Sequence, residues 1–420
     1  MSAQNKFRAG TALLFSLLLV FAVGTGQGAS PEPSSKPKVR AITAFVRLDR
    51  AHYKDQIQDA LKFLHGAKAA YEKFGYDVQT IRITTQPFPE YTRGLSEEQT
   101  LAFFREYDAL AIKEGFDASI GPAMMKDSDD PREAELLGKI LANAKTLEGS
   151  IFIGGEDGIH WKSIQAAAGV MKYLEANTLH SQGNFSFTTS SFVPDGTPFY
   201  PASYLASEGK RFAIGLQSAN VVAEALASTK SPELAEEHLR ASLTIYAQQV
   251  EKTAKEISRS TGWKYGGGDL SPAGLKDVSI GAAIENFLGA PMGSSGTLTT
   301  TALITRALKS IPVTQAGYSG LMLPVLEDSV LSQRWSEGRL SLDEMLSYSA
   351  VCGTGLDVIP LPGEVSKDQL AAILGDVASL SAKWHKPLSA RLLPVAGKKA
   401  GDQTEFDDPF LVNAKIQPLP

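Results

Sequence analysis

The sequence predicts a single α/β domain of about 380 residues, in which strands alternate with helices around a sheet or barrel. Three observations support this prediction. Segments rich in β-branched and apolar residues alternate with segments of helical periodicity, and no linker interrupts them after residue 38. Hydrophobic residues also make up 43% of the 420-residue chain, which is enough to bury a large core.

The predicted strands are short apolar runs, several of which end at turns that contain glycine or serine. They span Val39–Leu48, Asp77–Thr85, Ile151–Ile153, Phe185–Phe192, Arg211–Leu216, Leu321–Leu326, Leu356–Leu361 and Leu388–Pro394.

The predicted helices show apolar residues at spacings of three and four, together with residues that cap helix starts. Capping boxes open helices at Ser96, Ser341 and Ser366, and Ser231 followed by proline opens another. The other predicted helices span Asp55–Phe74, which Gly75 ends, and Lys162–Asn177, Ser279–Leu288 and Thr299–Ser310.

Composition excludes several classes of protein. Lys and Arg number 41 against 46 Asp and Glu, so the formal charge of −5 argues against a nucleic-acid partner. Cys352 is the single cysteine, which excludes an intramolecular disulfide and a multi-cysteine metal centre. The expected partner is therefore a small molecule, and self-association into a homo-oligomer stays open.

Residues 1–29 predict a secretory signal peptide. Lys6 and Arg8 precede the apolar run Thr11–Val23, and small residues follow it. The run is shorter than the roughly 20 residues that a membrane-spanning helix needs. A cleaved signal is therefore favoured over an uncleaved membrane anchor, and we expect a protein exported to the periplasm or the cell exterior, with no membrane association after cleavage.

The signal is followed by a predicted flexible linker over residues 30–38 (SPEPSSKPK), which contains three prolines and no other apolar residue. The folded domain is expected to span residues 39–420.

Five glycine-rich turns at predicted strand ends carry polar side chains. Ligands in α/β folds gather where loops leave the strands, and glycine lets a ligand approach the backbone. The alternative is that these glycines only form tight turns. The ligand-binding positions expected from the turns are Gly154, Gly155, Ser218, Ser271, Ser295 and Thr297.

Four acidic residues, Asp269, Glu327, Asp328 and Asp357, are the predicted catalytic carboxylates. They could provide general acid/base chemistry, or Asp269, Glu327 and Asp357 could bind a divalent cation such as Mg²⁺ or Ca²⁺. The alternative is structural, in which Glu327 and Asp328 open a helix whose dipole favours negative charge. No fixed ligand spacing selects the metal hypothesis.

Cys352 is a candidate nucleophile or a buried packing residue. Nucleophilic chemistry requires a lowered thiol pKa and a neighbouring base, whereas its apolar neighbours Ala350 and Val351 favour packing. Nucleophile-elbow, Walker A, dinucleotide-binding and zincin motifs are absent from the sequence.

Three stretches of the second half resemble a known family. They are Gly317–Asp328 (GYSGLMLPVLED), Leu340–Gly363 (LSLDEMLSYSAVCGTGLDVIPLPG) and Arg391–Phe406 (RLLPVAGKKAGDQTEF). The chain is similar, from about residue 39 to its end, to the DUF711 family, also called UPF0210, whose function is undefined.

This resemblance implies a single large α/β barrel with outer helices, similar to the core of glycyl-radical enzymes such as pyruvate formate-lyase. It does not imply radical chemistry, because Gly397 lies in VAGK and lacks the aromatic residue of the radical motif. The matching motifs place further residues at family positions: Asp269, Ser319, Glu327, Asp328, Cys352, Asp357, Lys398 and Lys399. Ser319, Lys398 and Lys399 thereby join the expected ligand-binding positions, and Cys352 joins the catalytic candidates.

The chain departs from the resembled family in three respects. Typical members lack a signal peptide, their Gly-Gly pair is Asp407-Asp408 here, and their A-P-G-T-T turn is replaced by Gly293–Thr297. We expect an exported enzyme acting on a small polar or anionic molecule at an acidic, glycine-rich pocket. The alternative is a non-catalytic barrel that binds or senses a small molecule.

Overall fold

The computed structural model describes residues 36–276 and 278–419, and the predicted signal peptide and most of the predicted linker lie outside them. Ten strands of this part form one sheet, in the order β8-β7-β1-β2-β3-β4-β6-β10-β9 with β5 paired to β4. The strands are β1 Lys38–Val46, β2 Val78–Thr85, β3 Asp117–Pro122, β4 Leu147–Gly155, β5 Gly158–Ile159, β6 Phe187–Ser191, β7 Arg211–Gln217, β8 Lys264–Asp269, β9 Gly355–Pro362 and β10 Leu388–Val395.

The long strands run in two opposite directions. β1, β2, β3, β4 and β6 are parallel to one another. β7 pairs antiparallel with β1, and β10 pairs antiparallel with β6. β8 is parallel to β7, and β9 is parallel to β10. The carboxyl ends of these two groups of strands therefore lie at opposite edges of the sheet.

The sheet is not closed by a continuous ladder among the described residues. β8 and β9 are the two ends of the strand order, and the segment between them pairs with these strands through two isolated bridges, Gly268 to Gln315 and Pro324 to Asp357. The predicted strand Leu321–Leu326 is accordingly wrong, because this segment crosses between β8 and β9 instead of extending along either. The expected α/β architecture with outer helices is confirmed, whereas barrel closure depends on these bridges alone.

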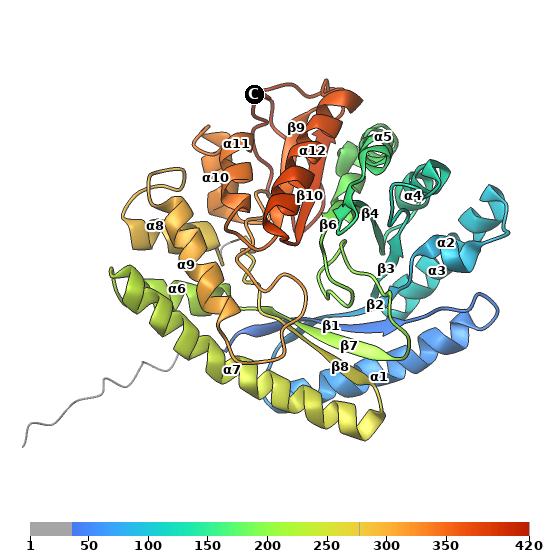
Figure 1. Cartoon of the computed structure of the whole chain (residues 1–420), viewed down its shortest axis with the longest axis horizontal. Coiled ribbons are helices and arrows are strands. Elements are labelled where there is room, and N and C mark those ends of the chain that lie inside the picture. Colours follow the sequence, from blue (N-terminus) through green and yellow to red (C-terminus); the bar gives the residue numbers. More distant parts are fainter. Residues whose placement is uncertain (1–35, 277, 420) are drawn as a thin grey trace, which may run out of the picture. The chain divides into compact units, whose positions relative to one another are not determined.

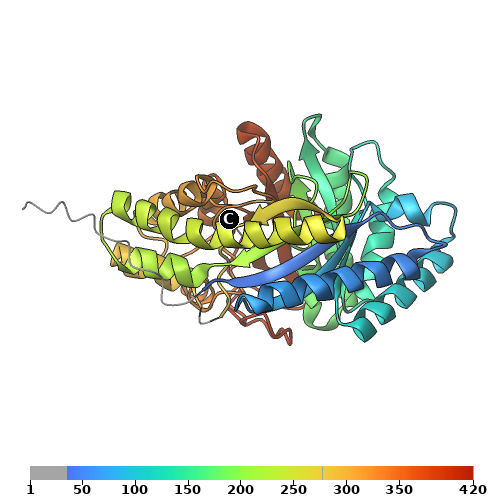
Figure 2. The same ribbon diagram turned by 90° about the horizontal axis from the view of Figure 1, so that it is seen from below.

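Helices surround the strands on the outside, as Figure 1 shows. The two longest helices, α1 and α7, lie side by side across β1, β7 and β8 (Figure 2). The helices are α1 Tyr53–Lys73, α2 Phe88–Thr92, α3 Glu97–Glu114, α4 Pro131–Ala142, α5 Trp161–Asn177, α6 Ala219–Ala227, α7 Pro232–Thr261, α8 Ile280–Leu288, α9 Thr297–Lys309, α10 Ser329–Ser336, α11 Leu342–Ser349 and α12 Lys367–Trp384, with the 3₁₀ segment η1 at Leu179–Ser186.

The three predicted capping boxes are confirmed. The side chains of Ser96, Ser341 and Ser366 each accept a hydrogen bond from the backbone N–H three residues later. The side-chain oxygen of the Gln or Glu at that position accepts one from the backbone N–H of the serine. Ser231 caps α7 with Pro232 in the first turn. Each cap satisfies backbone N–H groups that the first helical turn leaves unpaired. None of the described helices has the length and apolarity needed to cross a membrane.

Candidate functional site

A cavity of about 340 Å³ lies against side chains from seven strands, namely β1, β2, β3, β4, β6, β9 and β10. We call it the central cavity. Its lining near the strands includes Asp117, Lys145 and Thr146, which lie at the starts of β3 and β4 and not at their carboxyl ends. The charged residues on its wall are Arg40, Arg82, Lys145 and Arg391, and Asp117, Glu148, Glu327, Asp357 and Asp408.

Arg391 on β10 organises a buried ion cluster at this wall. Its Nη2 lies 2.6 Å from Glu327 Oε1, and its Nε donates to Asp357 Oδ1 at 2.9 Å. Arg40 on β1 reaches the other oxygen of Glu327 at 3.3 Å. The Arg391 guanidinium also lies over the Phe185 ring, 4.6 Å from its centroid. The structure therefore brings Glu327 and Asp357 together around Arg391.

The ion cluster depends on mutual compensation of charge. Burial raises the pKa of Asp357, while the positive charge of Arg391 acts in the opposite direction. Burial lowers the pKa of Arg391, but the charges of Asp357 and Glu327 together raise it above its ordinary value. Such clusters are stable only while complete, because removing one partner leaves a buried charge unpaired. Arg391 also occupies the place between the two carboxylates that a cation would need.

Arg82 on β2 is held differently. Its guanidinium lies 4.6 Å from the centroid of the Tyr200 ring, its Nε donates to Thr80 Oγ1 at 3.1 Å, and the nearest carboxylate oxygen, on Asp117, is 3.9 Å away. At that distance the ion pair is weak, so Arg82 keeps N–H groups available at the cavity wall.

Glu148 on β4 is a carboxyl group of the central cavity with strongly altered acidity. It makes no hydrogen bond or ion pair with any described residue, although it is only partly exposed. Burial raises the pKa of Glu148 from 4.5 to about 8, and Asp117 and Glu327 add to this, whereas Arg82 and Arg391 oppose it. A carboxyl with this pKa can both hold and release a proton near neutral pH.

Asp269, at the end of β8, has a structural role. It is fully buried and accepts hydrogen bonds from Ser271 Oγ at 2.5 Å, Tyr318 N at 2.8 Å and Ser319 N at 3.0 Å. These bonds hold a tight turn in which Gly317 has a φ of +61° and a side chain there would meet the Asp269 carboxylate. Asp269 does not line the central cavity.

Asp328 is likewise a helix cap. Its carboxylate accepts from Ile280 N at 2.7 Å, at the start of α8, and from Val330 N at 3.0 Å and Leu331 N at 3.1 Å, at the start of α10. Ser279 Oγ donates to it at 2.5 Å. These hydrogen bonds agree with the structural alternative for Asp328, since a single buried carboxylate satisfies the first turns of two helices.

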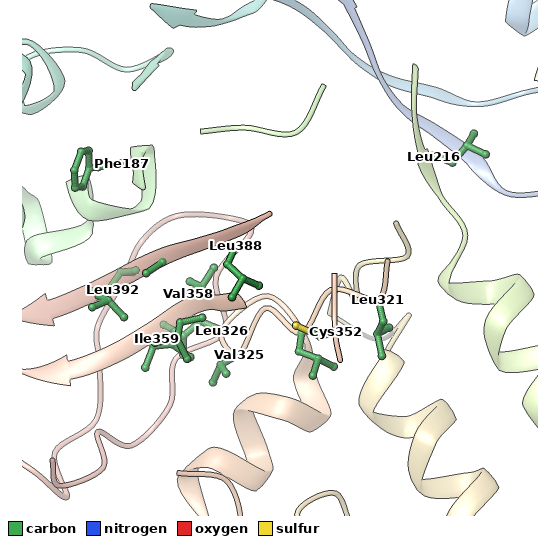
Figure 3. Packing of buried hydrophobic residues seen from close by; sticks show 14 of the residues in the cluster. Phe187, Leu216, Leu321, Val325, Leu326, Cys352, Val358, Ile359, Leu388 and Leu392 are labelled. Atoms are coloured by element: carbon green, nitrogen blue, oxygen red, sulfur yellow. The ribbon is translucent and has the colours of Figure 1, made fainter. Parts of the chain in front are cut away.

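Cys352 is buried within the large apolar cluster, among residues such as Leu321, Val325 and Leu388 (Figure 3). Its Sγ accepts a hydrogen bond from Gly355 N at 3.4 Å. Its surroundings are those of a packing residue, and it borders a second cavity, beside Lys386, that is separate from Glu148.

The expected ligand-binding positions do not line the central cavity. Lys398 pairs with Glu405 at 2.9 Å, and Ser271 and Ser319 belong to the turn around Asp269. Gly154 and Gly155 end β4, whereas Ser218 follows β7, so they lie at opposite edges of the sheet. The remaining positions, Ser295, Thr297 and Lys399, also lie outside the cavity lining.

Sequence reasoning missed every charged residue of the cavity wall except Glu327 and Asp357, and four of those missed are Arg40, Arg82, Glu148 and Arg391. Each of these four is an isolated charge within a strand of mostly apolar or β-branched residues, such as Arg391 in LSARLLPV. Because such strands are buried, an isolated charge in one is a signal for a polar interior. Among the described residues, no three His, Cys, Asp or Glu side chains gather as a metal site would need.

Comparison with known proteins identifies relatives of the whole domain. A family model described as uncharacterised ACR (DUF711) matches residues 33–407. A UPF0210 protein of Pyrobaculum arsenaticum is 29% identical over 394 residues, covering 87% of this chain and 86% of its own length. One of Pyrobaculum aerophilum is 30% identical over 351 residues, covering 79% and 76%.

Among solved structures, the anaerobic ribonucleotide reductase of Thermotoga maritima is similar to this chain with a TM-score of 0.39 and 8% sequence identity. The similarity covers 84% of this chain and 75% of the reductase.

Proposed function

This chain belongs to the DUF711 family, also called UPF0210, and we propose that it is an enzyme that transfers a proton to or from a small polar molecule in the central cavity. The volume of about 340 Å³ is within the range of small-molecule sites. Arg40 Nε and Thr354 Oγ1 are buried at this cavity without a hydrogen-bond partner among the described residues. A polar ligand would satisfy both atoms.

Glu148 is the proposed general acid/base, and its unpartnered carboxyl is the observation that carries the proposal. At neutral pH this carboxyl holds its proton, which it can donate to a ligand atom within hydrogen-bond reach and later take back. Arg82 would bind negative charge on the ligand, because its guanidinium is stacked on Tyr200 and poorly paired. Arg391 and its partners would hold the wall in place.

The proposal is tested by incubating the purified protein with a mixture of small hydroxy, keto, amino and phosphorylated acids and following each compound by NMR. We expect consumption of one compound, and Glu148→Gln should abolish it while ligand binding persists. Glu364→Gln, at an exposed position, is the matched control. Unchanged turnover in Glu148→Gln would refute the role of Glu148, and binding without turnover in the wild-type protein would favour the binding or sensing alternative.

We also propose that the protein is exported. The support is the basic, apolar and small-residue order of residues 1–29. Expression of the full-length chain in its host, followed by fractionation and N-terminal sequencing, tests this. We expect a mature product that begins near residue 29, and a cytoplasmic product that begins at Ser2 would overturn the proposal.

A further inference from the structure

We infer that the ligand of the central cavity is a small zwitterion, whose anionic end binds Arg82 and whose cationic end binds Asp408. This inference rests on the proposed function, because it concerns the same cavity. Some charged groups on the cavity wall are already paired with a charge of opposite sign, and others are not.

The paired groups form the Arg391 cluster. Arg391 is bound to Glu327 and Asp357, and Arg40 is bound to Glu327. A ligand that replaced any of these contacts would leave a buried charge uncompensated, which is costly. The cluster is therefore a structural part of the wall, and the charged groups outside it are the ones that can bind the ligand.

Three acidic residues of the wall lie outside the cluster: Asp117, 3.9 Å from Arg82, Glu148, assigned above to proton transfer, and Asp408, which makes no ion pair with a described residue. Asp408 lies in the C-terminal segment after β10, is half-buried, and borders the cavity together with Phe410. Its Oδ1 accepts a hydrogen bond from Phe410 N at 2.8 Å, whereas its Oδ2 accepts none from any described residue. The negative charge of nearby Glu327 adds to burial in raising the pKa of Asp408. A cationic ligand group at Asp408 would relieve this repulsion.

Outside the cluster the wall carries two positive charges, Arg82 and Lys145. Lys145 is exposed to solvent, whereas the Arg82 side chain is 11% exposed and its closest carboxylate oxygen is 3.9 Å away, so Arg82 is the buried positive charge that is poorly paired. Arg82 is on β2, where it contacts Thr80 and Tyr200, whereas Asp408 follows β10. Strands β3, β4 and β6 lie between β2 and β10 in the sheet, so the two groups belong to different parts of the wall.

A ligand with charges of both signs fits this arrangement better than an ion of one sign. A dianion would place negative charge beside Asp408 and Glu327, and a dication would place positive charge beside Arg82. Both arrangements are unfavourable, because water screens charges poorly inside a cavity.

The test compares binding of matched probes to the purified protein by titration calorimetry. The probes are ω-amino acids of three to six carbons, the unsubstituted fatty acids of the same length, and the corresponding dicarboxylates. We expect at least one ω-amino acid to bind about tenfold more tightly than its fatty acid and its dicarboxylate, as one charge-assisted hydrogen bond would provide.

Asp408→Asn should reduce this preference to about twofold or less, because the amide keeps the shape but loses the charge. Asp407→Asn is the matched control, since Asp407 is exposed and does not line the cavity. The inference is overturned if no ω-amino acid binds better than its matched probes, or if Asp408→Asn keeps the preference.

The failures of the two proposals are distinguishable. Glu148→Gln should keep the preference for ω-amino acids, since Glu148 is assigned to proton transfer. A preference that persists without turnover of any compound would refute only the enzymatic proposal. Turnover of a compound of one charge sign, together with no zwitterion preference, would refute only the inference about the ligand.

Discussion

Replacing Glu148 with Gln should change how the stability of the protein depends on pH. Below about pH 4.5 the Glu148 carboxyl is protonated in both the folded and the unfolded chain, so it contributes no pH dependence. Between about 4.5 and about 8 the unfolded chain releases this proton and the folded protein keeps it. Each rise in pH within this window therefore favours the unfolded chain, and above about 8 the effect is complete.

The magnitude follows from the two pKa values. At about 1.4 kcal/mol for each pH unit, the difference between 4.5 and about 8 corresponds to at most about 5 kcal/mol of unfolding free energy. Because Glu148 is partly exposed to the cavity, water solvates its ionised form and reduces this effect. We expect the wild-type protein to lose roughly 2–3 kcal/mol across the window relative to Glu148→Gln.

The assay is urea unfolding of both proteins, followed by circular dichroism at several pH values between about 5 and 9. The quantity compared is the difference in unfolding free energy between the two proteins at each pH, which cancels the titration of all other groups. Glu364→Gln, at an exposed position, should show a constant difference. A constant difference for Glu148→Gln, or one that changes only below about pH 5, would refute the reasoning.

Three further predictions concern Asp328, Arg391 and Cys352. Asp328→Ala should lower the unfolding free energy by about 3–5 kcal/mol in urea titrations, because two helix starts lose their cap, whereas Glu364→Ala should change it by less than about 0.5. Arg391→Met should cost about 3–5 kcal/mol at neutral pH and less in mild acid, where Asp357, whose pKa is raised by burial, takes up a proton; an equal cost at both would contradict the ion cluster. The Cys352 thiol should react with Ellman's reagent only after unfolding, and rapid labelling of the native protein would contradict its burial.

Local features of the fold could be predicted from the sequence because their causes are local. The capping boxes at Ser96, Ser341 and Ser366 need only residues three positions apart, and all three form. β8 was missed because its sequence, KYGGGD, has the composition of a turn. It forms a strand because it pairs with β7, a tertiary contact that local propensity does not contain.

The position of the cavity depends on strand direction, which the sequence pattern does not reveal. Grouping the turns after all strands assumes that the strands are parallel, and the antiparallel pairs of β1 with β7 and of β6 with β10 break this assumption. The interior is instead marked by single charges within buried strands, such as Arg82 and Glu148, whose side chains can meet across the sheet whatever the strand direction.

The glycines and acids of the second half are related through packing. A side chain at Gly274 would meet the Asp328 carboxylate, and one at Gly317 would meet that of Asp269, so each glycine makes room for a buried carboxylate that binds the backbone. The same reasoning explains Gly353, whose missing side chain lets its backbone approach that of Gly320. Motifs that combine glycine with acids thus preserve the turns that connect β8 to β9, whereas the function proposed above assigns proton transfer to a charged residue on a strand. Substitutions in these motifs should therefore reduce folding and binding together, whereas substitutions at Glu148 should separate them.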